Sequence, residues 1–200
     1  MIDNISRFAQ SGRSMIEMLG VLAIIGVLSV GGIAGYTKAM MKSKINSTVE
    51  TMLTIASNVR TLTLRTKSYD NLAKVAIKMK AIPEKALNGS SLGTNAFGGS
   101  VGLDGFYNKS FYIAMNGLPR EACVEIASKD FGSALVYAGN GDFGANKLSS
   151  LENTNLKFAN PACSSAAPYY CLKKPMSPAT ATQACSCAVS SGCSVALIMF

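Results

Sequence analysis

The chain has 200 residues, 48% of them hydrophobic, with 19 basic and 11 acidic side chains and a formal net charge of +8. This length allows one modest domain in addition to a membrane segment. Histidine is absent and the six cysteines form no paired CxxC knuckles, so the composition argues against a zinc site and against a cysteine nucleophile activated by histidine. We predict no cofactor, no metal site and no enzymatic activity.

The most informative segment lies close to the N-terminus. Gly12-Arg13-Ser14-Met15-Ile16-Glu17 is followed by an uncharged run from Met18 to Thr37. At 1.5 Å per residue, about twenty helical residues span about 30 Å, which is the thickness of the hydrocarbon core of a bilayer. The run is too long for a secretory signal peptide, and no clean A-x-A cleavage site follows it. A plain membrane anchor accounts for its length but not for Glu17 or for the glycine five residues before it.

One continuous helix is predicted from about Ser14 to about Arg65. There is no proline before Pro83 and no glycine between Tyr36 and Pro83. The first half is apolar all round, and the second half carries one apolar stripe at intervals of three and four residues, formed by Ile45, Val49, Met52, Ala56, Val59 and Leu62. The first half is therefore expected to span a membrane, and the second to pack against a globular head.

Five glycines interrupt the membrane-spanning half: Gly20, Gly26, Gly31, Gly32 and Gly35. Gly31 and Gly35 form a GxxxG pair, a pattern that favours close approach of another helix, although glycine is also generally common in membrane helices. Adjacent Gly31 and Gly32 make the weakest helical point of the segment.

Shorter elements are predicted after the long helix. A second helix runs from about Tyr69 to Met79, and a Gly/Ser/Asn-rich loop occupies 88–105. Strands are predicted at 100–103 and 110–115, with Asp104-Gly105 as the hairpin signal between them. A helix begins at Pro119 and carries Cys123, Ala127 and Phe131 on one side.

The C-terminal part continues this mixture of elements. We predict a strand at 135–137, a turn cluster at 139–146, a short helix at 178–186 and a final strand at 194–200 that is buried on both faces. The fold class is therefore α+β.

The cysteines indicate disulfides. Five of the six lie between Cys163 and Cys193 in a stretch rich in Ser, Ala, Pro and Thr, and an even number of cysteines in a small exported domain is typical of a disulfide framework. Fifteen pairings are compatible with six cysteines, and the spacing does not choose among them.

The N-terminal segment resembles the class III leader of type IV pilins and of their relatives, the pseudopilins of type II secretion. In that family a prepilin peptidase cuts after a glycine, and the mature helix carries glutamate at its fifth position. The resemblance implies cleavage after Gly12, N-methylation of the new terminus at Arg13, and Glu17 as that glutamate. Arg13 departs from the family pattern, in which the first mature residue is usually apolar.

The chemistry of Glu17 supports the same interpretation. An ionised carboxylate in hydrocarbon is costly unless it is paired with a cation. Cleavage after Gly12 creates an α-amino group on Arg13, which can neutralise Glu17 of a neighbouring parallel helix only at one axial offset. Glu17 is therefore hypothesised to set the register of assembly. The resemblance further implies that the helix partly unwinds near its glycines during assembly.

The head shows a second resemblance, to the type IVb branch. Asn95-Ala-Phe-Gly-Gly-Ser-Val101 is similar to the entry into the first strand of type IVb heads, and the helix after Pro119 carries the first cysteine, as theirs does. This resemblance implies a bond between Cys123 and Cys185. Cys163 with Cys171 and Cys187 with Cys193 would then be local pairs.

The resemblance implies a leader at 1–12, a helix at 13–66 whose residues 13–37 serve as membrane span and filament core, and a head at 67–200. In the head, it implies a small sheet of about four to six antiparallel strands packed against the second half of the long helix. Its implied function is that of a subunit of a type IV pilus, a fimbrial filament. The subunit enters the inner membrane with its head in the periplasm, polymerises with copies of itself on an assembly platform, and becomes extracellular. A type II secretion pseudopilin and a minor pilin are alternatives, and a membrane-anchored periplasmic enzyme or binding protein is an alternative of another class. The sequence does not choose among adhesion, aggregation, twitching, conjugation and DNA uptake; its scattered lysines allow contact with DNA but do not indicate it.

Overall fold

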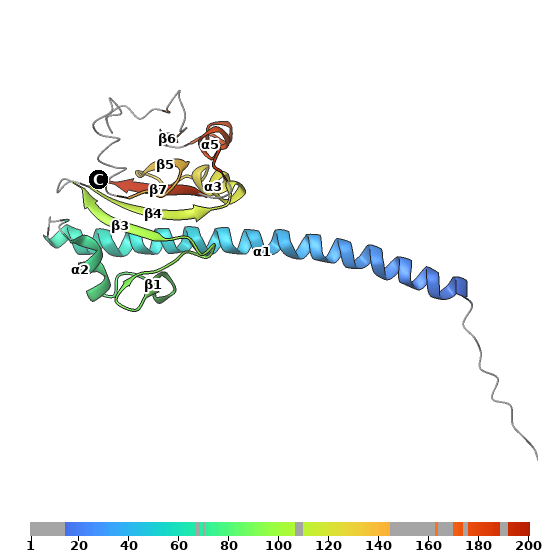
Figure 1. Cartoon of the computed structure of the whole chain (residues 1–200). Helices are drawn as coiled ribbons and strands as arrows, with labels where there is room; N and C mark the ends of the chain where they lie inside the picture. The colour runs from blue at the N-terminus through green and yellow to red at the C-terminus, as the bar shows by residue number, and fades with distance from the viewer. Residues whose placement is uncertain are drawn as a thin grey trace, which may run out of the picture. The chain divides into compact units, whose positions relative to one another are not determined.

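The computed structural model describes residues 15–66, 69, 71–106, 110–144, 163, 170–173, 176–188 and 192–200 (Figure 1). The chain forms two compact units, Met1–Met41 and Lys42–Phe200. Residues 1–14, which include the predicted leader, Gly12 and Arg13, lie outside the described part. The second unit includes the latter half of the long helix, because the apolar stripe of that half contributes to the core of the head.

The long helix α1 extends over Met15–Thr66, within one residue of its predicted bounds at each end. In its Lys42–Thr66 part, the predicted stripe residues Ile45, Met52, Ala56 and Val59 are buried. Val49 and Leu62 are half-buried. Ile55 is also fully buried, although it was not placed in the predicted stripe. It lies three residues after Met52 and four before Val59, so it shares their helix face.

Three threonines also lie on the buried side of α1, where a free hydroxyl would be unfavourable. Thr48, Thr51 and Thr63 donate to the carbonyl oxygens four residues earlier, at 2.9, 2.7 and 3.0 Å. Each hydroxyl therefore satisfies its hydrogen bond within the helix itself and exposes only its methyl group to the core.

The remaining elements alternate helices with antiparallel strands. In chain order they are α2 (Leu72–Lys78), η1 (Glu84–Ala86), β1 (Leu87–Asn88), β2 (Ser91–Leu92), β3 (Val101–Phe106), β4 (Ser110–Leu118), α3 (Arg120–Ala127), β5 (Leu135–Asn140), β6 (Tyr170–Lys173), α5 (Pro178–Ala184) and β7 (Cys193–Met199). The predicted α+β class with a long N-terminal helix, an antiparallel sheet and disulfides is confirmed.

Two predicted loops are partly wrong. The segment 88–105 contains the end of β1, all of β2 and most of β3, and the turn cluster at 139–146 begins only after β5 ends at Asn140. Asp104-Gly105 lies inside β3, so it is not the hairpin turn. A Cβ atom at Gly105 would lie 2.2 Å from the carbonyl oxygen of Tyr69, so the glycine is required by close backbone approach within a strand.

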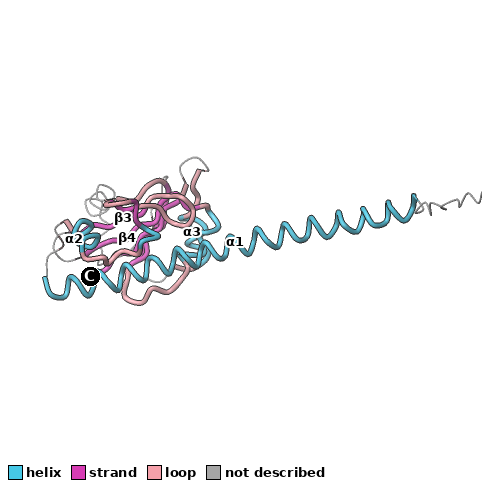
Figure 2. Tube along the Cα trace, turned by 90° about the horizontal axis from the view of Figure 1, so that it is seen from below, coloured by secondary structure: helices cyan, strands magenta, loops and turns pink. Residues whose placement is uncertain are grey.

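The main sheet has five strands in the order β3-β4-β7-β5-β6, and every pairing is antiparallel. The C-terminal strand β7 occupies the centre, and all of its side chains are buried, which confirms the predicted burial over 194–199. Phe200, which the prediction included, follows the strand and is exposed. α2 and α3 lie toward opposite ends of this sheet in both views (Figures 1 and 2). A separate two-stranded sheet joins β1 and β2.

One face of the sheet is packed around aromatic rings. Phe143, which follows β5, contacts Tyr112 of β4 edge to face at a centroid distance of 5.3 Å and Tyr137 of β5 at 4.5 Å. These rings form a buried cluster with Ala114, Leu135, Ala196 and Ile198. Aromatic pairs of this geometry stabilise a core beyond the area they bury.

A buried amide holds Phe143 against the sheet. The Oδ1 atom of Asn116 accepts from the Phe143 N–H at 2.9 Å, and its Nδ2 donates to the Phe143 carbonyl at 3.3 Å and to Ser100 Oγ at 3.1 Å. The Asn116 carbonyl accepts from Asn95 Nδ2 at 2.7 Å. Asn116 therefore ties the β3–β4 end of the sheet to the segment after β5, at the point where the β4–β7 register shifts.

Candidate functional site

The first candidate site is the Met15–Met41 part of α1, considered by itself. Its apolar side chains are exposed, from Met15 at 82% to Leu28 at 68% and Ile33 at 65%. The helix is long and apolar enough to cross a membrane. Isolated exposed apolar residues are common, but an unbroken apolar surface of this length marks contact with lipid or with other protein.

Glu17 lies in the first turn of this helix. It is the only charged residue between Met15 and Lys38. No ion pair of Glu17 occurs among the described residues. Arg13, whose terminus is its predicted partner in a neighbouring subunit, lies outside the described residues. The register contact, which we expect between neighbouring chains, remains a prediction.

The glycines of this segment are not required by close contact with any other described residue. A Cβ atom built at Gly20, Gly26, Gly31, Gly32 or Gly35 would meet nothing within 4 Å. Each glycine in a helix interior costs about 0.5–1 kcal/mol relative to alanine. At about 100° per residue, Gly20, Gly31 and Gly35 project within about 60° of one another and on the same side as Glu17. These three glycines therefore lie on the same side of the helix as the only carboxylate of the Met15–Met41 part, together with the larger side chains of Ile24 and Leu28.

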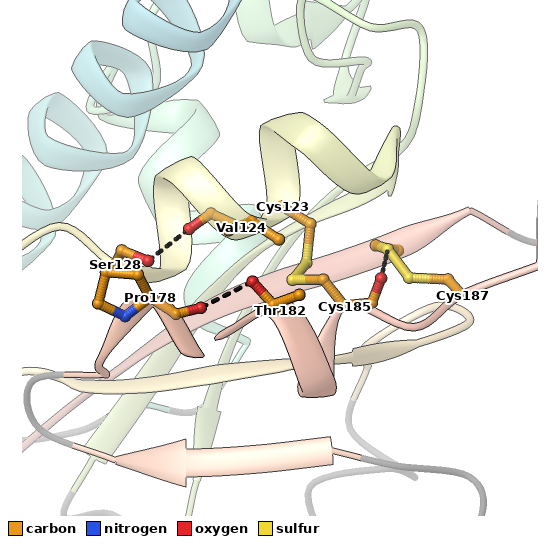
Figure 3. The surroundings of a disulfide bond; sticks show 8 residues. Cys123, Val124, Ser128, Pro178, Thr182, Cys185 and Cys187 are labelled. Carbon is orange, nitrogen blue, oxygen red and sulfur yellow. Dashed lines mark hydrogen bonds between the residues drawn. A yellow bond between two sulfur atoms is a disulfide. The ribbon is translucent and has the colours of Figure 1, made fainter. Parts of the chain in front are cut away.

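The second candidate site is the disulfide-bonded region of the head (Figure 3). Cys123 of α3 is joined to Cys185, which directly follows α5, with a Cα–Cα distance of 5.9 Å. Cys187 is joined to Cys193 at the start of β7, with a Cα–Cα distance of 5.4 Å. These are two of the three pairs that the resemblance to type IVb pilins implies.

The third expected pair is only partly described. Cys163 is disulfide-bonded, but the side chain of Cys171 in β6 lies outside the described residues. The sulfur atoms of Cys123, Cys185 and Cys193 lie within 4.8 Å of one another. All three are in disulfides, whereas a cysteine binds a metal ion as the free thiolate.

Local hydrogen bonds stabilise the ends of α3, which carries Cys123, and of α5, which Cys185 directly follows. Ser177 caps α5 by accepting from Thr180 N at 3.2 Å, and Pro178 occupies the first turn, where it loses no helical hydrogen bond. Ser128 Oγ donates to the carbonyl of Val124 at 2.7 Å at the end of α3 (Figure 3). α3 and α5 pack against each other and against β5, so the long-range bond joins two helices that the sheet already brings together.

Polar contacts fix the Lys42–Thr66 part of α1 to the head. Lys42 pairs with Glu125 of α3, and Glu50 pairs with Lys85 of η1 at 3.1 Å. The Asn58 amide donates to the Ala81 carbonyl at 2.8 Å. Sequence reasoning missed these contacts, because each joins residues 23 to 83 positions apart without a local signal.

Comparison with known families decides the assignment. The family model described as "PilS N terminal" matches residues 32–167, which is more than half of the chain. The chain belongs to the PilS family. This membership confirms the resemblance to type IV pilins that Gly12, Glu17 and the apolar run indicate.

Curated relatives of this PilS-family chain agree with the match. The major structural subunits of the bundle-forming pilus from Escherichia coli O127:H6 (strain E2348/69 / EPEC) and from Escherichia coli O111:H- are each 25% identical over 150 residues, covering 72% of this chain and 78% of the relative. Among solved structures, a type IV b pilin from Salmonella typhi shares 14% identity at a TM-score of 0.45, covering 76% of this chain and 97% of that one.

Proposed function

We propose that this chain is the structural, non-enzymatic subunit of a type IV pilus of the type IVb kind. The observation that carries the proposal is the exposed apolar helix Met15–Met41, which aligns Glu17 with glycines that contact none of the other described residues. Membership of the PilS family and similarity to major subunits of a bundle-forming pilus support it.

In this proposal the subunit first crosses the inner membrane through its N-terminal helix, with the head in the periplasm. A prepilin peptidase cuts after Gly12 and the new terminus at Arg13 is N-methylated. An inner-membrane platform then transfers the helix from lipid into a bundle of parallel helices, and the filament becomes extracellular. The apolar surface of Met15–Met41 thus serves as a temporary anchor and later as the filament core.

Glu17 has a specific role in this scheme. Two carboxylates at equivalent heights in a bundle would repel each other, and each would be costly to bury without a cation. The α-amino group of Arg13 on the next subunit supplies that cation at one axial offset. Register errors are then disfavoured, because they leave both charges unpaired.

The test is replacement of Glu17 in cells that express the full chain. Glu17→Ala should reduce surface filaments at least tenfold while leaving the amount of membrane-inserted subunit unchanged, and Glu17→Asp should retain part of the assembly. Glu121→Ala, which removes an exposed carboxylate of α3, is the matched control. Wild-type filament yield from Glu17→Ala subunits would exclude the register role.

A further inference from the structure

A partly enclosed depression of about 640 Å³ lies between α2 and the β1–β2 hairpin. Lys74, Lys78 and Lys80 line it, together with Glu84 as its single acidic residue. All three lysines are exposed, and no ion pair of theirs occurs among the described residues. The rim therefore has a net charge of +2 that the described part of the chain does not neutralise.

Two of these lysines occupy positions that α2 itself disfavours. Lys74 lies in the first turn, where the positive end of the helix dipole repels a cation and where α2 has no acidic residue. Lys80 adopts φ 53°, a left-handed conformation that normally selects glycine or asparagine. Only Lys78, in the last turn, gains from the dipole.

Lys80 holds the position after the helix end at which glycine is most common. Its N–H donates to the Ile77 carbonyl at 3.0 Å, and the Ala81 N–H donates to the Ala76 carbonyl at 2.8 Å. This pair of bonds is the Schellman motif, with Lys80 in the glycine position. Strain of this kind in a non-glycine residue often accompanies function.

The depression also has an apolar part. Ile77, Ile82, Pro83 and Leu87 line it and are less exposed than the lysines, and Ile82 is buried at 3% exposure; these four residues form the apolar floor. On the other side lies the two-residue turn Gly89-Ser90, in which Gly89 has the positive φ, 59°, that the first central position of a type II′ turn requires. Cations above an apolar floor match a ligand that carries an anionic group on an apolar body.

We propose that this depression binds organic phosphates, with the phosphate held by Lys74, Lys78 and Lys80 and the apolar portion held against Ile77, Ile82 and Leu87. Lysine binds phosphate as a point charge, and three ammonium groups offer several donors to its oxygens. The carboxylate of Glu84 repels any second acidic group of the ligand from its side of the rim. The site goes beyond filament assembly, and it does not depend on the role proposed for Glu17.

The test uses the full chain in nanodiscs of phosphatidylcholine, titrated calorimetrically with phenyl phosphate and with inorganic phosphate at low salt. Phenyl phosphate should bind at least fivefold more tightly than inorganic phosphate, because only its ring contacts the apolar floor. Lys74→Gln/Lys78→Gln should weaken its binding about tenfold. Arg120→Gln/Lys129→Gln, which removes the same net charge from the start of α3 and from the second residue after its end, should leave it unchanged.

Lys80→Gly separates binding from folding. Relief of the left-handed strain should raise the urea midpoint of the head, whereas loss of the ammonium group should weaken phenyl phosphate binding. A merely structural Lys80 would give the first change without the second, which would overturn the proposal. Equal loss of binding in the α2 and α3 double variants, or equal affinity for the two phosphates, would overturn it as well.

Two further measurements identify what fills the depression in the cell. If bilayer phosphate fills the site, phenyl phosphate binds more weakly in nanodiscs containing phosphatidylglycerol than in neutral ones; equal binding assigns the site to a soluble phosphate. Filament yield of Lys74→Gln/Lys78→Gln is scored in parallel. If the wild-type chain does not bind phenyl phosphate and Lys74→Gln/Lys78→Gln loses filament assembly, the depression is assigned to contact with a second copy of this chain. That result would refute the proposal while leaving the pilin function intact.

Discussion

The two described disulfides close loops of very different length, and their removal should therefore destabilise the head unequally. Cys123–Cys185 joins residues 62 positions apart and Cys187–Cys193 joins residues 6 positions apart. In the chain-entropy model the longer loop is worth about 4 kcal/mol and the shorter about 2 kcal/mol. Cys123 and Cys185 are both fully buried, so alanine at these sites adds the loss of core contacts.

The perturbation is Cys123→Ala/Cys185→Ala, with Cys187→Ala/Cys193→Ala as the matched variant. Each variant keeps the other described bond, which peptide mapping of the oxidised protein verifies. Unfolding of the full chain by urea in a fixed non-ionic detergent can be followed by tyrosine fluorescence, because the chain has seven tyrosines and no tryptophan. The long-range variant should lose at least about 2 kcal/mol more unfolding free energy than the local one. Equal losses, or a larger loss in the local variant, would show that loop length does not set the contribution of these disulfides.

Three other predictions follow from contacts within the head. Asn116→Ala leaves the Phe143 N–H and carbonyl without their amide partner and should reduce the unfolding free energy by about 3 kcal/mol in the same urea assay, whereas exposed Asn46→Ala should change it by less than about 0.5 kcal/mol. Gly105→Ala places a methyl group against the Tyr69 backbone and should cost about 2–3 kcal/mol, while Gly144→Ala, which meets nothing within 4 Å, should be nearly neutral in thermal melts. Glu125→Gln breaks the partly exposed pair with Lys42 and should cost at most about 1 kcal/mol, and that loss should shrink in high salt; a salt-independent loss would argue against the ion pair.

Much of this architecture could be predicted, because its signals are local. The bounds of α1 follow from a long stretch without proline and from the apolar stripe, and β7 follows from the apolar segment at 194–200. β1 and β2 were missed because strands of two residues are too short to show an alternating pattern. Asp104-Gly105 was interpreted as a turn because the contact that requires Gly105, with Tyr69, comes from far earlier in the chain.

The residues of the candidate sites also divide into those with a local signal in the sequence and those without one. Glu17 and the glycines are visible in the sequence, because a carboxylate beside an uncharged run is a local feature. The role of Asn116 is not visible in the sequence, because its partner Phe143 lies 27 residues away. The lysine-lined depression was also missed, because its floor and rim come from α2, η1 and the β1–β2 hairpin, whose relative placement only the fold establishes.

The central claim is that a precursor is cut after Gly12 and then polymerised through the helix that begins at Arg13. The most direct test is mass spectrometry of the N-terminal peptide of subunits recovered from filaments sheared from the cell surface. Cleavage after Gly12 followed by methylation should give a peptide that begins at N-methylated Arg13. A surface-exposed chain that retains Met1, or a cut at any other position, would contradict it.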